Sequence, residues 1–256
     1  MKFSLNLNKI ALLRNARGDN YPNLDDYANI AIDLGVDGLT LHPRPDHRHA
    51  TSSDVISIAK LCKDRGVEFN LEGNPFSEKS DIFLGFKNLV LESKPDQITL
   101  VPDLPNQITS DHGWESGDHD QALKALISDF KNITPTSKIS LFVDHIKNGE
   151  PNLSIVEYAK LIDVDGIEIH TGAFSKCIDK GDLSIIESLS RLITITNTTN
   201  LFVNAGHDLN LRNLPELIKI GGINEVSIGH AVIIESLKNG FTDTIKSYIN
   251  LIKGKL

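Results

Sequence analysis

The chain has 256 residues, of which 40% are hydrophobic and 23% charged, and its formal net charge is −8. These proportions are typical of a globular protein and exclude a disordered chain, a collagen-like repeat and a disulfide-rich scaffold. The acidic balance, with no dense run of Lys and Arg, argues against a nucleic-acid-binding protein. The two cysteines, Cys62 and Cys177, form no CxxC motif, so they suit a reducing compartment and provide no structural zinc site.

The N-terminal segment and the hydropathy of the chain bear on its location. No apolar stretch approaches the roughly 20 residues that a membrane-spanning helix needs. Residues 1–9 alternate polar and apolar side chains and lack the continuous apolar run of a signal peptide. We therefore interpret this segment as a first strand, and we expect a cytoplasmic protein that binds neither membranes nor nucleic acids.

Short β-rich runs alternate with longer stretches of helical periodicity along the whole chain. We predict strands at residues 3–8, 38–42, 68–72, 97–101, 139–144, 166–170, 201–204 and 225–228. Helical segments separate or follow them, and examples with an apolar face are residues 25–34, 122–130 and 241–252. Alternating strands and helices imply parallel βαβ units.

Eight such units in about 250 residues predict a (β/α)8 barrel, the TIM barrel fold. No linker or low-complexity run divides the chain, so we expect a single TIM-barrel domain over residues 1–256. An open doubly wound sheet is the alternative, but no glycine-rich GxGxxG turn follows the first strand.

Polar side chains gather at the predicted strand ends, where the active site of such a barrel lies. Five of the nine histidines fall there: His42, His145, His170, His207 and His230. Histidines and carboxylates at one barrel mouth suit proton transfer near neutral pH. Glu72 lies at the end of the predicted third strand, where its carboxylate can act as a general base or as a metal ligand. Glu168 alternates with two isoleucines, so its charge should point into the barrel and be paired or functional.

Two regions have the composition of anion sites. Arg44 lies two residues beyond the second strand, in a loop rich in Arg and His, and guanidinium groups bind phosphate in a bidentate manner. The seventh and eighth strands lead into Gly206-His207 and Gly229-His230, where glycine lets backbone N–H groups approach a phosphate. The simpler alternative is a solvated loop and two glycines that only turn the chain.

A series of short motifs runs along nearly the whole chain. They are LLRNARG at 12–18, DGLTLHPR at 37–44, RH at 48–49, NLE at 70–72, LVP at 100–102, IEIHTG at 167–172, NAGH at 204–207 and IGHA at 228–231. In this order they resemble the pyridoxine 5′-phosphate synthase family of the deoxyxylulose-dependent vitamin B6 pathway.

The resemblance implies a (β/α)8 barrel with extra helices that assembles as an octamer built from dimers. It implies a ring-closing condensation of 1-deoxy-D-xylulose 5-phosphate with 3-amino-2-oxopropyl phosphate. The products are pyridoxine 5′-phosphate, inorganic phosphate and water, and no metal or organic cofactor is used.

The resemblance also implies roles for individual residues. His42 and Glu72 correspond to proton acceptors, His207 to a proton donor and Glu168 to a carboxylate that stabilises the transition state. The residues at positions that bind the amino-ketone phosphate are Asn6, Arg17, Asp208, Gly229 and His230. Those at positions that bind the sugar phosphate are Asn8, Lys9, Arg44, His49 and Thr109. Thr109 lies in a long stretch after the fourth strand that we interpret as a lid.

The chain departs from the best-known members at two places. Asn8-Lys9 replaces Asp-His, and Asp208 replaces glycine. These departures favour one alternative, a non-catalytic relative that binds phosphate ligands. A second alternative is a metal-dependent barrel hydrolase or isomerase that uses Glu72, His170 and His207 as ligands.

Overall fold

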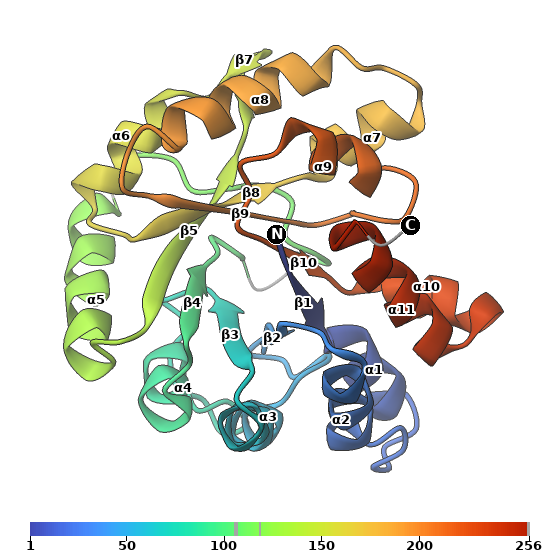
Figure 1. The fold of residues 1–256 in the computed structure, drawn as a ribbon. Helices are drawn as coiled ribbons and strands as arrows, with labels where there is room; N and C mark the ends of the chain where they lie inside the picture. The colour runs from blue at the N-terminus through green and yellow to red at the C-terminus, as the bar shows by residue number, and fades with distance from the viewer. Residues whose placement is uncertain (105–106, 118, 255–256) are drawn as a thin grey trace.

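The computed structural model describes residues 1–104, 107–117 and 119–254. Its main strands are β1 (Lys2–Asn6), β2 (Gly38–Leu41), β3 (Glu68–Gly73), β4 (Gln97–Leu100), β5 (Lys138–Asp144), β8 (Gly166–His170), β9 (Phe202–Gly206) and β10 (Glu225–Ile228). They form one closed, parallel barrel in the order β1-β10-β9-β8-β5-β4-β3-β2 (Figure 1). The barrel closes because β1 pairs with both β10 and β2. The TIM-barrel prediction is therefore confirmed, and the open-sheet alternative is wrong.

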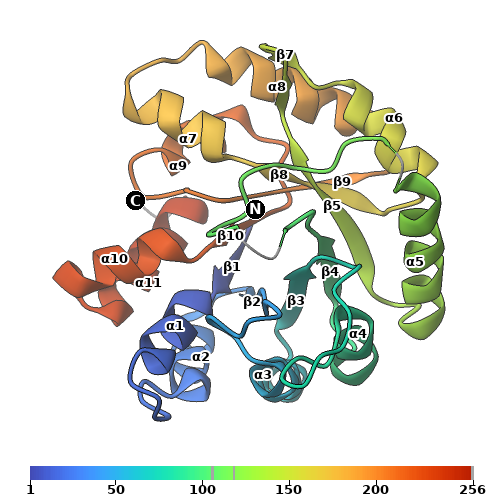
Figure 2. The same ribbon diagram turned by 180° about the vertical axis from the view of Figure 1, so that it is seen from behind.

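Helices surround the barrel on its outside (Figures 1 and 2). They are α1 (Asn8–Asn15), α2 (Leu24–Leu34), α3 (Ser52–Arg65), α4 (Phe86–Ser93), α5 (Asp120–Ile133), α6 (Ser154–Leu161), α7 (Gly172–Asp179), α8 (Ile185–Thr196), α9 (Leu214–Ile220), α10 (His230–Asn239) and α11 (Phe241–Ile252). A small hairpin of β6 (Ile146–Lys147) and β7 (Glu150–Pro151) follows β5. Within the described residues, no helix is long and apolar enough to cross a membrane.

Local sequence signals set several of these boundaries. Thr51 and Asp54 form a capping box that starts α3. Gly35 and Gly66 end α2 and α3 in the left-handed conformation, with φ values of 96° and 66°. The first strand is shorter than predicted, because Asn8 begins α1 instead of lying in β1. The Asn6 side chain accepts a hydrogen bond from the Asn8 N–H at 3.0 Å, which turns the chain.

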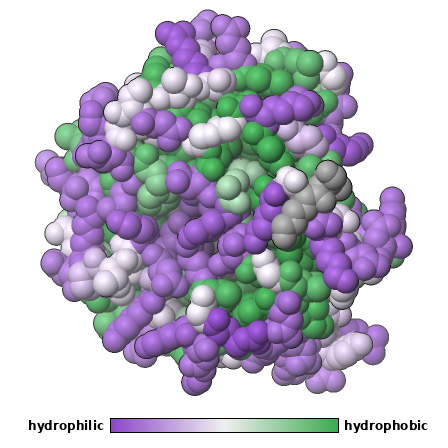
Figure 3. Space-filling view, viewed as in Figure 1, coloured by the Kyte–Doolittle hydropathy of each residue, from purple (hydrophilic) through white to green (hydrophobic). Residues whose placement is uncertain are grey.

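The apolar core lies between the outer faces of the strands and the helices. Tyr248 on α11, for example, is fully buried, and its ring stacks on Phe3 of β1 with centroids 5.8 Å apart. The inner faces of the strands carry polar side chains instead, such as Ser4, which hydrogen-bonds Thr40 at 2.7 Å. On the face seen in Figure 3, hydrophilic residues cover most of the surface with apolar patches between them. The apolar core therefore packs against the outside of the barrel, and polar side chains occupy its inside.

Candidate active site

A cavity of about 490 Å³ lies at the carboxyl ends of the barrel strands. Its lining includes the following predicted site residues: Asn6, Asn8, Lys9, His42, Arg44, His49, Glu72, Thr109, Glu168, His207, Asp208, Gly229 and His230. The structure therefore brings together every predicted site residue except Arg17. Strand ends that are far apart in sequence therefore line one cavity, as expected for this fold.

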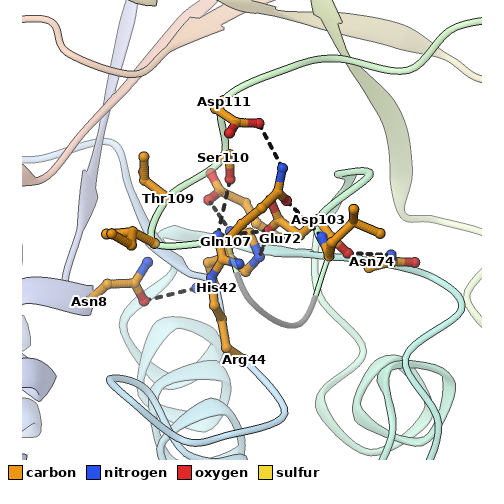
Figure 4. A network of polar contacts seen from close by, with 12 residues as sticks. Asn8, His42, Arg44, Glu72, Asn74, Asp103, Gln107, Thr109, Ser110 and Asp111 are labelled. Atoms are coloured by element: carbon orange, nitrogen blue, oxygen red, sulfur yellow. Dashed lines mark hydrogen bonds and ion pairs between the residues drawn. The ribbon is translucent and has the colours of Figure 1, made fainter.

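His42 lies directly after β2 in the floor of this cavity and is 6% exposed. Its Nε2 lies 2.8 Å from Oδ2 of Asp103, and its Nδ1 lies 3.6 Å from Oε2 of Glu72. The His42 backbone N–H donates to the Asn8 side chain at 3.0 Å, which ties β2 to α1. Figure 4 shows His42 among these polar neighbours. The imidazole is therefore held between two carboxylates.

Asp103, a residue that the sequence analysis missed, links this histidine to Arg44. Its Oδ2 lies 3.0 Å from the Arg44 guanidinium, and both side chains are buried. Burial alone would raise the pKa of Asp103, but His42 and Arg44 lower it to about 2. Burial likewise lowers the pKa of His42, but Asp103 and Glu72 outweigh it, so the pKa of His42 is raised. The one sequence signal for Asp103 is its position directly after the LVP motif.

Glu72 on β3 and Glu168 on β8 both line the cavity. Glu72 accepts hydrogen bonds from Asn6 at 3.5 Å and from Ser227 at 3.4 Å. Glu168 is 3% exposed and accepts a hydrogen bond from Thr99 at 3.2 Å, so its predicted inward direction is confirmed. Burial and the nearby Glu72 charge raise the pKa of Glu168 well above its ordinary value. Glu168 therefore keeps its proton to higher pH than an exposed glutamate does.

His207 follows β9 on the other side of the cavity. Its Nε2 lies 2.8 Å from the Thr109 hydroxyl, and its Nδ1 lies 3.2 Å from Asp208 Oδ2. Both His207 and Asp208 have positive φ, at 86° and 58°, which is uncommon for residues other than glycine. The hydrogen bond with His207 lowers the pKa of Asp208. The Asp208 side chain therefore contacts His207.

Between β4 and α5, residues 101–104 and 107–117 form a segment that crosses the end of the barrel (Figure 2). Besides the Thr109 contact, Ser110 accepts a hydrogen bond from Arg44 at 3.4 Å, and the Gln107 carbonyl accepts one from Arg48 at 2.6 Å. Figure 4 shows Gln107, Thr109 and Ser110 arranged over His42 and Glu72. Further along, Gly113 donates to Asp144 at the end of β5 at 2.9 Å. The segment is thus anchored on both sides of the cavity, as a lid would be.

The cavity has two walls suited to anions. One carries Arg44, Lys9 and His49, and burial, followed by the charges of His42 and Arg44, lowers the pKa of His49 to about 3. The other is the start of α10, where Gly229 and His230 line the cavity. A Cβ at Gly229 would lie 2.8 Å from the Asn6 carbonyl oxygen, so glycine is required for this close approach. A helix N-terminus of this kind favours phosphate.

Arg17 is exposed beyond the end of α1 and does not line the cavity. It also lies outside a more open hollow of about 640 Å³, which is lined by residues of α1 to α3 such as Arg14 and Asp54. Within residues 1–104, 107–117 and 119–254, no group of three or more His, Cys, Asp or Glu side chains is arranged to hold a metal ion. The ligand set of the metal-dependent alternative is therefore not assembled there.

Known proteins similar to this chain agree on one family. Residues 3–254 match the family model described as pyridoxal phosphate biosynthesis protein PdxJ. Pyridoxine 5′-phosphate synthase of Xylella fastidiosa (strain 9a5c) is 40% identical over 253 residues, covering 98% of this chain and 94% of that protein. The synthase of Xanthomonas oryzae pv. oryzae (strain MAFF 311018) is 38% identical over 259 residues, covering 99% and 97%.

Solved structures with similar folds are more distant in sequence. A mutant tryptophan synthase α-subunit from the hyperthermophile Pyrococcus furiosus superposes with a TM-score of 0.62 at 16% identity, over 99% of this chain and 98% of that one. Thiamine phosphate pyrophosphorylase from the same organism gives a TM-score of 0.60 at 13% identity, over 99% and 96%. At these identities the likeness shows the barrel fold alone. By sequence along nearly its whole length, the chain belongs to the PdxJ family of pyridoxal phosphate biosynthesis proteins.

Proposed function

We propose that this enzyme condenses 1-deoxy-D-xylulose 5-phosphate with 3-amino-2-oxopropyl phosphate to give pyridoxine 5′-phosphate, inorganic phosphate and water. The observation that carries the proposal is the convergence of His42, Glu72, Glu168 and His207 on one cavity. The relatives named pyridoxine 5′-phosphate synthase support the product. The closed ring forms from two phosphorylated halves, so the site must hold two anions and move several protons.

The proton acceptors in this proposal are His42 and Glu72. Asp103 stabilises the imidazolium that forms when His42 takes a proton, because a carboxylate 2.8 Å from Nε2 favours the charged ring. Within the described residues, Glu72 accepts long hydrogen bonds from Asn6 and Ser227, and its Oε2 lies 3.6 Å from His42 Nδ1, so no short contact holds its oxygens away from a proton of the substrate. A carboxylate and an imidazole side by side can accept protons in successive steps.

The proton donor is His207, which delivers a proton to a departing hydroxyl or phosphate group. Its Nε2 already contacts the Thr109 hydroxyl across the cavity, so it faces the volume where substrates bind. Glu168 lines the same cavity and keeps its proton to higher pH than an ordinary glutamate. It can hydrogen-bond developing negative charge on a substrate oxygen in a water-poor setting, where such a bond stabilises a transition state strongly.

We assign one phosphorylated substrate to each of the two walls that are suited to anions. Arg44, Lys9 and His49 would hold the sugar phosphate, and the start of α10 with Asn6 and His230 would hold the amino-ketone phosphate. Lys9 supplies a cation beside Asn8, so the Asn8-Lys9 pair is compatible with phosphate binding. Holding both substrates in one cavity converts their encounter into an intramolecular reaction.

The test is an incubation of the purified protein with the sugar phosphate and with the amino-ketone generated in place, since it is unstable. We expect pyridoxine 5′-phosphate, detected by fluorescence and mass, in the presence of a chelator. His42→Asn, shown to be folded by circular dichroism, is the matched control and should form none. No product despite measured binding of either substrate would favour the non-catalytic relative. Activity that a chelator removes would favour the metal-dependent enzyme.

We also propose that the chain assembles as an octamer built from dimers. Exposed apolar side chains on α1 and α10, including Leu12, Leu13 and Leu237, support an interface on this side of the barrel. Light scattering after gel filtration tests this, and a mass of one chain would contradict it.

A further inference from the structure

The IEIHTG motif at residues 167–172, at the end of β8, contributes one residue, Glu168, to the proposed chemistry and leaves His170, Thr171 and Gly172 without a role. His170 is buried, and its Nδ1 lies 2.8 Å from Oδ1 of Asp144 at the end of β5. Burial would raise the pKa of Asp144, but hydrogen bonds from His170 and Gly113 keep it below its usual value. An ionised carboxylate only accepts, so Nδ1 of His170 carries the proton. The orientation of the His170 ring is therefore set by Asp144.

The ring that Asp144 orients lies directly against His207. The centroids of the His170 and His207 rings are 4.9 Å apart, with an interplanar angle of 85°. This edge-to-face arrangement is a favourable one for two aromatic rings. Space for the His170 ring depends on the glycine two residues further along, since a Cβ at Gly172 would lie 2.7 Å from His170 Nε2.

Thr171 supports the backbone of the same donor histidine, His207. The Thr171 hydroxyl lies 2.7 Å from the Gly206 carbonyl oxygen and 2.5 Å from that of His207, and the Thr171 N–H donates to the Gly206 carbonyl at 2.8 Å. His207 and Asp208 need such support because both have positive φ. The motif thus holds His207 twice, through its backbone by Thr171 and through its ring by His170.

We propose that His170, oriented by Asp144, is a positioning residue that fixes the ring of His207 for proton transfer. The inference rests on the proposed function, in which His207 is the proton donor. A donor must point its Nε2 at the reacting group, and rotation of an imidazole about its side-chain torsions would turn Nε2 away. Asp144 also accepts a hydrogen bond from the Gly113 N–H, in the segment over the cavity. The Asp144 carboxylate therefore contacts both that segment and His170, the residue that supports the proton donor.

The test compares His170→Asn and Asp144→Asn with His145→Asn as the matched control. The His170 variant removes the ring against His207. The Asp144 variant offers an amide that donates to His170 where a carboxylate accepted, which selects the other tautomer. His145 is also buried and lies nearby, but its Nδ1 contacts the His170 backbone carbonyl at 3.3 Å rather than the His207 ring.

We expect the first two variants to lower kcat about tenfold while KM for both substrates changes by about twofold or less. NMR gives a second measurement that needs no turnover: the His207 ring signal, assigned from its absence in His207→Asn, should broaden or split in both variants and stay single in the control. Thermal unfolding of each variant shows whether it is folded, and Asp144→Asn carries the same test if His170→Asn is not.

Unchanged kcat and an unchanged His207 signal in the folded variants would overturn the inference. Failure of the proposed function looks different: His207→Asn would then remain active, whatever the variants of His170 do to the ring signal. A change in the ring signal together with an active His207→Asn would mean that His170 positions His207 for binding rather than for proton donation, and it too would overturn the inference as stated.

Discussion

Oδ2 of Asp103 lies 2.8 Å from Nε2 of His42 and 3.0 Å from the guanidinium of Arg44. The buried carboxylate of Asp103 thus contacts both His42, a proposed base, and Arg44, which we propose binds phosphate. It orients the imidazole and offsets the charge of Arg44 before any anion binds. Because Asp103 is on the segment that crosses the cavity, the position of that segment and the chemistry of His42 are physically connected.

We predict that Asp103→Asn lowers the pKa of His42, because the carboxylate that favours the imidazolium is lost while burial still opposes it. The acid limb of kcat/KM should move to lower pH, and kcat/KM at neutral pH should fall about tenfold or more as His42 loses its orientation. The measurement is kcat/KM between about pH 5.5 and 9, which spans the ordinary histidine range. Asp111→Asn, on the same segment but exposed, is the control and should leave the limb in place. An unmoved limb in Asp103→Asn would contradict the prediction.

From the contact between Asp103 and His42 we also predict how the stability of the fold changes at acid pH. The pKa of Asp103 is about 2 in the folded protein and about 3.9 in an unfolded chain, so its contribution is complete above about pH 4 and is lost as pH falls toward 2. Such a difference corresponds to about 2 kcal/mol. Urea unfolding at about pH 7 should show Asp103→Asn to be less stable by roughly this amount, and the deficit should shrink at about pH 3. A deficit equal at both values of pH would show that packing, not charge, is responsible.

For two buried glutamates, Glu168 and Glu225, we predict that the stability of the fold changes with pH in the opposite direction. Burial raises the pKa of Glu168, with help from Glu72, and that of Glu225, with help from Glu68. A raised carboxyl pKa means that the folded state binds more protons, so stability is greatest below about pH 4.5 and falls as pH rises toward the folded pKa.

Glu168→Gln and Glu225→Gln form a matched pair for this test. Each should reduce the loss of unfolding free energy that accompanies a rise in pH above about 4.5, measured with urea. Only Glu168→Gln should impair product formation, since Glu225 lies at the opposite end of the barrel, where β10 begins. Equal losses of activity in the two variants would argue against a special role for Glu168.

Thr109 provides a test of the segment over the cavity. Thr109→Val removes the hydroxyl that lies 2.8 Å from His207 Nε2 at nearly constant volume, whereas Thr109→Ser keeps it. We expect kcat/KM to fall about tenfold in the valine variant and by about threefold or less in the serine variant. Steady-state kinetics with each substrate varied in turn gives the comparison. Equal effects of the two changes would assign the loss to shape instead of hydrogen bonding.

The sequence predicted the barrel well because its signals are local. Strand and helix periodicity repeats through the chain, and single glycines, Gly35 and Gly66, end two of the helices. The inward direction of Glu168 followed from strand alternation alone. The end of the first strand was wrong because a hydrogen bond between the Asn6 side chain and the backbone of Asn8 competes with extension, and periodicity does not register such a bond.

The partners within the site were harder to predict, because they join residues far apart in the chain. Thr109 and His207 are 98 positions apart, and Asp103 meets His42 from a segment with no periodicity. The family resemblance supplied Thr109 but no role for Asp103 or His170, since motifs identify positions and not contacts. Arg17 shows the converse, because its motif matches while its side chain lies outside the cavity.

Gly206 gives the last prediction, because its missing side chain makes room for Glu168. A Cβ built on Gly206 would lie 2.5 Å from Glu168 Oε1, closer than any ordinary contact, and the backbone there cannot move without disturbing β9. Gly206→Ala should therefore push the carboxyl group out of place, lowering kcat about tenfold or more and the free energy of unfolding by about 1–3 kcal/mol.

Two further variants separate this steric effect from a general loss of glycine. Gly117→Ala, where a Cβ meets nothing within 4 Å, should leave both quantities unchanged. Combining Gly206→Ala with Glu168→Asp shortens the displaced side chain by one methylene, so stability should return toward that of Glu168→Asp alone while activity stays low. Urea unfolding of the parent, the two single variants and the double variant measures the coupling between the two sites. Strictly additive losses would show that Gly206 serves the strand rather than the carboxyl group beside it.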